Sequence, residues 1–286
     1  ERGATRQAAV LDFLAQQSQP VPLAEARQRV NCNKAVADAL VSGGLVTIQH
    51  IEVRREPLSD YAITPSYPLT LTTNQKSALE RIQSSLRRQR EGNASPAVFL
   101  LHGVTGSGKT EIYLQALAEA VKLGKRGIVL VPEIALTPQT IERFAARFPG
   151  KVAVLHSKLS LGEQFDEWWR IRDGGFDVVI GSRSAIFAPQ PELGLIVIDE
   201  EHEWTYKQHD KPPLYHACDV AIKLAELTGA VVILGSATPD VETFYYAQRG
   251  DYHQLSLLER VVPNEASPLP QVEVIDLRDE LKVGNR

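Results

Sequence analysis

One run of the sequence has the spacing needed to hold phosphate groups. Gly103 is separated by four residues from Gly108-Lys109-Thr110, which completes the pattern G-x-x-x-x-G-K-[ST] of a phosphate-binding loop. Glycines let backbone N–H groups curl around phosphate oxygens, the lysine reaches the outer phosphates, and the threonine hydroxyl can hold Mg²⁺. The pattern therefore predicts a nucleoside triphosphate site. Its expected ATP-binding residues are Gly103, Val104, Thr105, Gly106, Ser107, Gly108, Lys109 and Thr110.

A pair of acids supplies the second set of reactive groups. Asp199 and Glu200 directly follow the apolar run 195–198, and ligands of open α/β sheets bind at the carboxyl ends of the strands. We expect Asp199 to share the Mg²⁺ with Thr110, and Glu200 to orient and deprotonate the water that attacks the γ-phosphate. A single acid after an apolar strand would be a solvated loop residue, but two acids downstream of a complete phosphate loop favour catalysis. The predicted catalytic residues are Lys109, Asp199 and Glu200.

The run Gly235–Pro239 closes the last expected strand with small hydroxyl residues. Ser236 and Thr238 could sense the nucleotide and relay its state to other parts of the protein. Serine and threonine are also favoured at helix N-caps, so the two interpretations stay open for these residues alone.

Strands and helices must alternate along the chain to position these groups. The apolar run 98–101 is an expected strand before the phosphate loop, and a helix is expected over 111–121. This alternation continues, and it predicts an α/β fold with a mostly parallel sheet covered on both faces. The further expected strands are 127–131, 151–155, 177–180, 195–198 and 230–234, with helices at 137–148, 161–173 and 216–227.

The first 60 residues predict a separate small domain. Three short helical patterns, at 8–17, 22–30 and 34–41, precede the strand-like run 45–53, an order typical of a winged helix-turn-helix. Lys34, or Arg54 and Arg55, could contact DNA. Seven basic and seven acidic residues give this segment no net attraction to phosphate, which favours a structural or positioning role. Residues 61–72 are expected to form a linker, and the run 271–277 alternates like a strand.

Composition limits the classes of protein that the chain can belong to. The 286 residues carry a net charge of −4 and no apolar run of the roughly 18 residues that a membrane span needs. Cys32 and Cys218 lie far apart, so they predict neither a zinc site nor a disulfide framework, and a reducing cytoplasm is the default. The chain opens on Glu1 and contains no methionine, which leads us to expect a piece of a longer protein.

The exact residues of several motifs resemble those of one family. GVTGSGKT, DEEH and SAT together resemble motifs of superfamily 2 helicases. The runs 131–139 (VPEIALTPQ), 181–189 (GSRSAIFAP) and 199–208 (DEEHEWTYKQ) are similar to the primosomal protein N′ (PriA) family of replication-restart helicases, and the resemblance extends over most of the chain. It implies an ATP-dependent 3′-to-5′ DNA helicase with a RecA-like P-loop lobe over 73–250. It also implies that 251–286 connects to an absent second lobe.

The resemblance also implies roles for individual residues. Gln75 matches a glutamine that contacts adenine, which competes with the capping box that its spacing from Thr72 predicts. His202 would link the metal site to the SAT segment. Trp204, Tyr206 and Lys207 match an aromatic-rich loop that couples DNA binding to hydrolysis, in agreement with the stacking of bases on aromatic faces. The residues expected to bind DNA are Glu133, Thr137, Gln139, Arg183, Ser184, Trp204 and Tyr215. We expect Trp168 and Trp169 to be core or packing residues.

The expected cofactors are ATP and Mg²⁺, with zinc only in the absent part of the parent protein. The family implies single-stranded and forked DNA, other primosome proteins and single-stranded-DNA-binding protein as partners of a monomer in the bacterial cytoplasm. Without a second lobe the chain lacks an arginine finger, so we expect it to bind ATP and hydrolyse it poorly. Two alternatives stay open: a binding module without hydrolysis, and a P-loop regulator that reads an operator through its winged helix with ATP as a switch.

Overall fold

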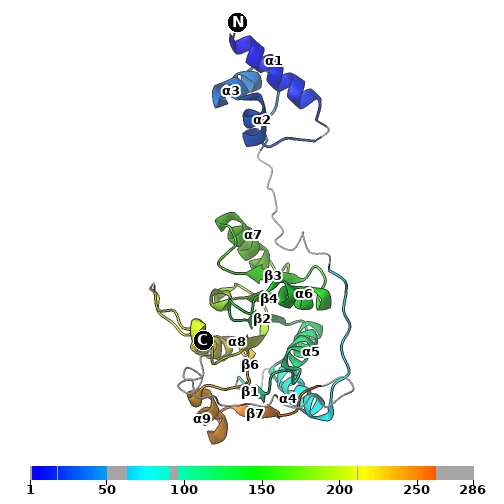
Figure 1. The fold of residues 1–286 in the computed structure, drawn as a ribbon, viewed down its shortest axis with the longest axis vertical. Helices are drawn as coiled ribbons and strands as arrows, with labels where there is room; N and C mark the ends of the chain where they lie inside the picture. Colours follow the sequence, from blue (N-terminus) through cyan, green and yellow to red (C-terminus); the bar gives the residue numbers. More distant parts are fainter. Residues whose placement is uncertain (1, 18, 50–62, 91–95, 211, 262–286) are drawn as a thin grey trace, which may run out of the picture. The chain divides into compact units, whose positions relative to one another are not determined.

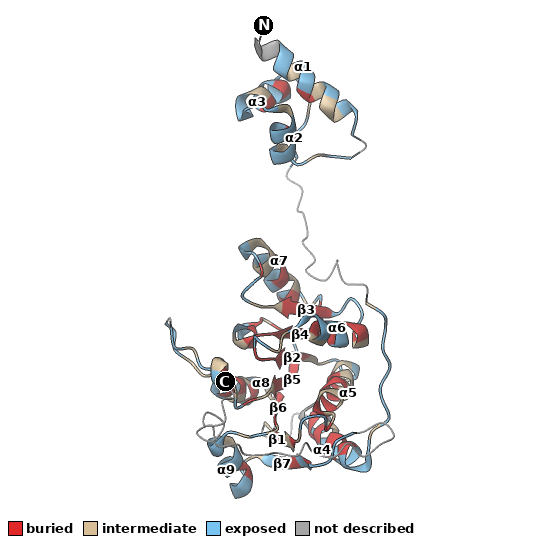
Figure 2. Cartoon of the chain, in the orientation of Figure 1, coloured by how far each residue is buried: buried red, intermediate tan, exposed pale blue. Residues whose placement is uncertain are grey.

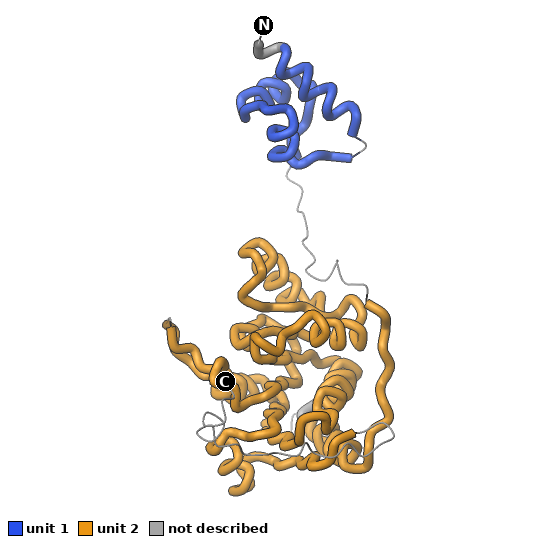
Figure 3. The backbone as a smooth tube through the Cα atoms, in the orientation of Figure 1, with its two compact units in different colours: residues 1–54 blue, residues 55–286 orange. Residues whose placement is uncertain are grey.

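The computed structural model describes residues 2–17, 19–49, 63–90, 96–210 and 212–261. The chain forms two compact units, residues 1–54 and residues 55–286 (Figure 3). The boundary between them falls within the expected domain 1–60. The finer division into a linker, a lobe over 73–250 and a connector over 251–286 stays a prediction.

Within the described residues, the first unit consists of three helices (Figure 1), and they enclose a small apolar core. They are α1 (Arg2–Ala15), α2 (Leu23–Val30) and α3 (Lys34–Ser42), close to the three expected ranges except that α1 begins six residues earlier. The core side chains are Val10, Ala26, Ala37 and Leu40. Residues 45–49 form no strand, and the rest of the expected wing, with Arg54 and Arg55, lies outside the described residues. A winged helix therefore stays a prediction, while the helical part is present.

The second unit is built on a parallel sheet in the order β3-β4-β2-β5-β6-β1-β7. Its strands are β1 (Val98–Gly103), β2 (Arg126–Leu130), β3 (Val152–Leu155), β4 (Val178–Gly181), β5 (Leu193–Asp199), β6 (Val231–Ser236) and β7 (His253–Leu257). Its helices are α4 (Thr73–Arg90), α5 (Lys109–Lys122), α6 (Pro138–Arg147), α7 (Leu161–Arg172), α8 (Ala217–Thr228) and α9 (Val241–Arg249), with 3₁₀ turns η1 (Arg183–Phe187) and η2 (Trp204–Tyr206). The predicted α/β class and parallel sheet are confirmed, and β7 is a strand that the sequence did not predict.

The inner strands are mainly apolar because both faces of the sheet are covered (Figure 2), whereas the edge strand β7 carries His253, Gln254 and Ser256. Successive side chains point to opposite faces, so Val129 joins one core while its neighbours Ile128 and Leu130 join the other. Side chains of α4, α5 and α6 complete the first core, and side chains of α7, η1 and α8 complete the second. The sheet is thus fixed from both sides, which holds the ends of its strands in register.

The second half of the expected linker is attached to the lobe. The guanidinium of Arg147 forms an ion pair with Glu111 at 3.0 Å, and both side chains are largely buried. Arg147 Nη2 also donates to the carbonyl of Tyr67 at 3.0 Å, while the Glu111 carboxylate accepts from the backbone N–H of Leu69 at 3.0 Å. The chain before α4 is therefore tied to α5 and α6.

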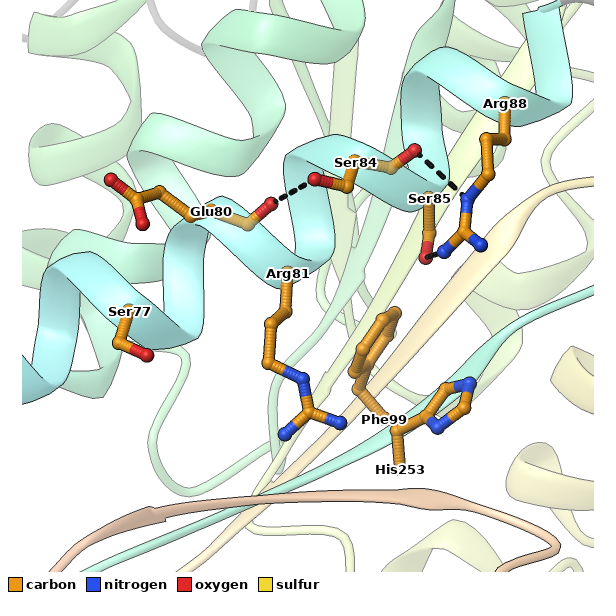
Figure 4. Close-up of a pocket in the computed structure, with 8 residues that line it drawn as sticks. All are labelled: Ser77, Glu80, Arg81, Ser84, Ser85, Arg88, Phe99 and His253. Atoms are coloured by element: carbon orange, nitrogen blue, oxygen red, sulfur yellow. Dashed lines mark hydrogen bonds between the residues drawn. The ribbon is translucent and has the colours of Figure 1, made fainter.

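The edge strand β7 is held by α4 (Figure 4). Arg81 extends from α4 and donates to the carbonyl of Gln254 at 3.2 Å, and the rings of Phe99 and His253 lie 5.2 Å apart. The hollow between them contains none of the predicted site residues. In the part of the chain that the structure describes, no helix is both long enough and apolar enough to cross a lipid bilayer.

Candidate ATP site and nucleic-acid groove

The phosphate loop joins β1 to α5, as its strand–turn–helix pattern predicted. Gly106 and Gly108 have φ angles of 81° and 80°, in the left-handed region that favours glycine. A Cβ at Gly103 would lie 2.6 Å from Ser107 Oγ, and a Cβ at Gly108 would lie 2.3 Å from Gln75 Nε2. The backbone angle therefore explains glycine at 106 and 108, and the lack of space for a Cβ explains glycine at 103 and 108.

The loop has the properties of an oxyanion cradle. Lys109 opens α5, is buried, and donates from its ammonium group to the carbonyl of Gly103 at 2.7 Å. Ser107 Oγ is buried and has no hydrogen-bond partner among the described residues. A helix N-terminus, a converging lysine and an unpartnered hydroxyl suit a phosphate group, so the residues present fit a bound triphosphate.

The segment after the lobe's last helix braces this loop, which the sequence did not predict. The backbone N–H of Val104 donates to the carbonyl of Leu257 at 3.1 Å, and the N–H of Val261 donates to the carbonyl of Gly106 at 2.9 Å. The alternating run His253–Leu257 was the only signal that could have revealed this strand. It is short and carries a polar residue at every other position.

Gln75 completes the predicted capping box and also contacts the phosphate loop. Its Oε1 accepts from the backbone N–H of Thr72 at 2.8 Å, and Thr72 Oγ1 accepts from the N–H of Gln75 at 3.3 Å, which completes the capping box. Its Nε2 donates to the carbonyl of Ser107 at 2.8 Å. The start of α4 is thereby attached to the phosphate loop, and the contact with adenine stays a prediction.

Asp199 ends β5 and is held by two tyrosine hydroxyls. Tyr113 Oη donates to Asp199 Oδ1 at 3.0 Å, and Tyr206 Oη donates to the Asp199 carbonyl at 2.7 Å. Burial, followed by the charge of Glu200, raises the pKa of Asp199, while the Tyr113 hydrogen bond lowers it. The carboxylate therefore lies in a setting where a cation beside it would strongly favour its charged form.

The structure reveals Tyr113 as a site residue that the sequence analysis missed. It lies on α5 three residues after Thr110, a spacing that places both on one helix face and could have drawn attention to it. A Cβ at Gly235 would lie only 1.7 Å from Tyr113 Oη, so the glycine before Ser236 leaves the room that this hydroxyl needs. Long-range packing of this kind has no local sequence signal.

The two residues expected to hold Mg²⁺ line one cavity. Thr110, Tyr113 and Asp199 line the same small cavity between α5, α6 and the sheet. A hydroxyl and a carboxylate are ligands that Mg²⁺ accepts, and the remaining ligands would be phosphate oxygens and water. Within the described ranges there is no cluster of three or more His, Cys, Asp or Glu side chains that could form a metal site of its own.

His202 lies between Glu200 and the SAT segment. Glu200 has a φ of 47°, a left-handed angle that is uncommon outside glycine and is often found at functional sites. His202 Nδ1 lies 3.8 Å from Glu200 Oε2 and 2.7 Å from Ser236 Oγ, and His202 Nε2 lies 3.4 Å from Thr238 Oγ1. The structure therefore brings the predicted relay residues together.

Glu201 forms a further link that the sequence analysis did not assign. Its carboxylate is buried and accepts from the backbone N–H of Asp240 at 2.8 Å and from Thr243 Oγ1 at 3.1 Å. Burial raises the pKa of this group, although both hydrogen bonds lower it. Glu201, the third residue of the DEEH motif, thus attaches this motif to the start of α9.

Loops after four strands, β2, β3, β4 and β5, converge on one groove beside the acids. Six of the residues expected to bind DNA or to couple it to hydrolysis line this groove: Glu133, Arg183, Ser184, Trp204, Tyr206 and Lys207. Trp204 is 72% exposed, so its ring is available for stacking. Thr137 instead caps α6 by accepting from the N–H of Thr140 at 3.3 Å, and neither it nor Gln139 lines the groove.

The aromatic-rich loop is fixed at both of its sides. Arg183 Nη1 donates to the carbonyls of Thr205 and Lys207 at 2.9 and 2.7 Å, so its guanidinium positions this loop. Tyr206 is buried and reaches Asp199 through its hydroxyl. Tyr215 packs edge-on against Phe187 at 4.9 Å. The groove is therefore connected through the Tyr206 hydroxyl, by one hydrogen bond, to the backbone carbonyl of Asp199.

Trp168 and Trp169, which we expected to be core or packing residues, do not lie in the core. Both lie on α7 and are 39% and 40% exposed. Ile171 provides the buried contact of this helix with the sheet, and the two indole rings lie outward of it, 5.5 Å apart.

Comparison with known proteins gives consistent matches. A sequence profile described as DEAD/DEAH box helicase matches residues 72–245. The chain is 47% identical over 287 residues to replication restart protein PriA of Bacillus subtilis, which covers 100% of this chain and 34% of the relative. It is 44% identical to replication restart protein PriA of Synechocystis, over 98% of this chain and 33% of the relative. The chain thus spans about a third of the length of these relatives.

A solved structure of RecG bound to a three-way DNA junction is also similar. It superimposes with a TM-score of 0.51 and 25% sequence identity, over 70% of this chain and 25% of that chain.

Proposed function

Because the chain belongs to the DEAD/DEAH box helicase family, we propose that it is the ATP-binding part of a DNA helicase that acts in replication restart. Its similarity to replication restart proteins over its whole length supports the replication-restart assignment. The observation that carries the proposal is the aromatic-rich loop, which lines the groove with Trp204 and hydrogen-bonds to Asp199 through Tyr206. One short loop thus touches both candidate sites.

The residues around the phosphate loop divide the work of ATP hydrolysis. Lys109 and the backbone N–H groups of the loop hold the phosphates, and Thr110 and Asp199 hold Mg²⁺, which neutralises phosphate charge when it is bound. Glu200 accepts a proton from the attacking water at its carboxylate. Gln75 orients the adenine. His202 passes the state of the γ-phosphate to Ser236 and Thr238, to which it is hydrogen-bonded.

The groove holds single-stranded DNA by stacking and by charge. Bases stack on Trp204, and Lys207 attracts the phosphate backbone. Ser184 and Glu133 contact the strand from the loops after β4 and β2, while Thr137 and Gln139 extend that contact toward α6. Arg183 and Tyr215 keep the aromatic-rich loop in place, so DNA that shifts this loop also shifts Tyr206 and, through it, Asp199.

The whole protein would be a monomer in the bacterial cytoplasm that unwinds forked DNA with 3′-to-5′ polarity. A second lobe would supply the arginine finger, and a zinc-binding part would lie in the remainder of the parent protein. Other primosome proteins and single-stranded-DNA-binding protein would be its partners. An ATP-switched regulator is less well supported, since α3 carries Lys34 as its single basic residue, balanced by Asp38.

ATP hydrolysis with and without forked DNA tests this proposal. We would compare this chain, a longer protein in which a second lobe follows it, and the Glu200→Gln variant of the longer protein. DNA should stimulate the longer protein, and Glu200→Gln should reduce hydrolysis about 10²- to 10⁴-fold while ATP still binds. Equal rates with and without DNA would overturn the coupling role of the aromatic-rich loop.

A further inference from the structure

A second hollow lies beside the groove, between α7, the end of β3 and η1. Trp168 from α7 and Phe187 from η1 line it, together with His156 and Gln164. Both aromatic side chains are well exposed, at 39% and 53%. Two accessible aromatic residues around one hollow are unusual on a surface where single exposed apolar residues are the norm.

This hollow adjoins the groove. Ser157 and Ser184 line both of them, so the two concavities share a border. At this border the Ser157 hydroxyl donates to the Glu133 carboxylate. A strand that leaves Trp204 in the groove would thus reach Trp168 in the hollow.

The polar groups of the hollow suit a neutral ligand with hydrogen-bonding edges. His156 Nδ1 accepts from the backbone N–H of Lys158 at 3.2 Å, so its other nitrogen carries the proton of the neutral ring and can donate. Burial, followed by the charge of Lys158, lowers the pKa of His156, which keeps the ring neutral at physiological pH. Gln164 donates to the carbonyl of Leu159 at 2.9 Å, which leaves its Oε1 as an acceptor.

We propose that this hollow binds one unstacked base of single-stranded DNA, with Trp168 as its stacking platform. The proposal rests on the proposed function, because it extends the same DNA track beyond the groove. The Glu133 carboxylate at the border disfavours a phosphate there, whereas a base offers an uncharged aromatic face and polar edges. The ring of Trp169 is turned to Phe165 and Arg172 instead, at 6.0 and 4.6 Å, and does not line the hollow.

The neighbouring tryptophan provides a matched control. Trp168→Ala and Trp169→Ala remove the same side chain from adjacent, equally exposed positions of one helix, but only Trp168 lines the hollow. The probe is a fluorescein-labelled oligothymidylate of about 15 nucleotides, long enough for a typical single-strand site, and anisotropy reports its affinity at fixed salt. A second probe of equal length carries abasic sites. Melting temperature and ATP binding verify that each variant is folded.

We expect Trp168→Ala to weaken oligothymidylate binding about fivefold or more, as the loss of one stacked base does. Trp168→Phe should keep most of the affinity, Trp169→Ala should stay within about twofold of the unaltered chain, and the abasic probe should not distinguish the variants. Unchanged affinity of Trp168→Ala would overturn the proposal. Equal losses of oligothymidylate affinity in Trp168→Ala and Trp169→Ala would also overturn the proposal, and would indicate that both tryptophans on the outer face of α7 contribute to binding. If the folded, unaltered chain binds ATP but no oligothymidylate, the proposed function itself fails.

Discussion

The hydroxyl of Tyr113 offers a sharp test of the metal site. Tyr113→Phe removes one oxygen atom from a fully buried ring and with it the 3.0 Å hydrogen bond to Asp199 Oδ1. The substitution should therefore leave the fold intact and change the carboxylate alone. Because burial already raises the pKa of Asp199, the loss of this hydrogen bond raises it further, and Mg²⁺ must then displace a proton more often.

The size of the effect follows from the position of the hydroxyl behind a metal ligand. Hydrogen bonds to ligating carboxylates are typically worth about 10- to 100-fold in metal affinity. We expect a loss of Mg²⁺ affinity at the lower end of this range, about tenfold, because the backbone N–H of Glu200 still donates a hydrogen bond to Asp199 in the variant. A tenfold change corresponds to about 1.4 kcal/mol, close to the lower end of the range for a hydrogen bond to a charged group.

Fluorescent ATP analogue binding, titrated with Mg²⁺ and repeated in EDTA, measures this effect. The Mg²⁺ concentration at half-maximal enhancement should rise about tenfold, and more at acidic pH, while binding in EDTA stays the same. Tyr206→Phe is the matched control, since its hydroxyl donates to the backbone carbonyl of Asp199 instead of the carboxylate. Unchanged Mg²⁺ dependence in Tyr113→Phe, or an equal change in Tyr206→Phe, would refute the reasoning.

Three other substitutions have definite expected outcomes. Glu200→Gln should reduce ATP hydrolysis by a protein that contains both lobes about 10²- to 10⁴-fold and leave ATP affinity unchanged, as measured by steady-state rates and equilibrium binding. Gly108→Ala should weaken ATP binding and lower the melting temperature, because its φ is 80° and the new Cβ would meet Gln75 Nε2. Arg147→Ala should lower the free energy of unfolding in urea by about 3 kcal/mol, since it leaves the Glu111 carboxylate largely buried without its ion pair. Burial raises the pKa of Glu111, but hydrogen bonds from Arg147 and other donors outweigh it and lower this pKa overall. The ionised Glu111 therefore stabilises the fold fully above the ordinary glutamate pKa, and this stabilisation disappears as the pH falls through the lowered pKa. In Arg147→Ala the free energy of unfolding should depend less on pH in this acidic range.

Features with a fixed local spacing could be predicted from the sequence. The phosphate loop, the DEEH acids and the SAT hydroxyls lie where strands end, and the alternation of strands and helices was sufficient to place them. Of the two contacts of Gln75, only the capping box could be predicted, since Thr72 is three residues away in the sequence, whereas Ser107 is 32 residues away.

Features that depend on long-range packing could not be predicted. Nothing near Tyr113 in the sequence indicates that its hydroxyl meets Asp199, or that Gly235 must be small to admit it. The motif around Arg183 indicated a DNA contact, which stays a prediction, but not that its guanidinium donates to two backbone carbonyls of the aromatic-rich loop. The exposure of Trp168 depends on which face of α7 meets the sheet, and a short helix with apolar residues on several sides leaves that open.

The central claim is that the groove and the ATP site are coupled through the aromatic-rich loop. The most direct test is the affinity of this chain for an ATP analogue with and without saturating oligothymidylate, measured also in Trp204→Ala. Coupling between sites is commonly about 5- to 150-fold and is reciprocal, so DNA should change ATP affinity by at least about fivefold, and ATP should change DNA affinity by the same factor. Trp204→Ala should abolish both changes. Equal ATP affinity with and without bound DNA would contradict the account.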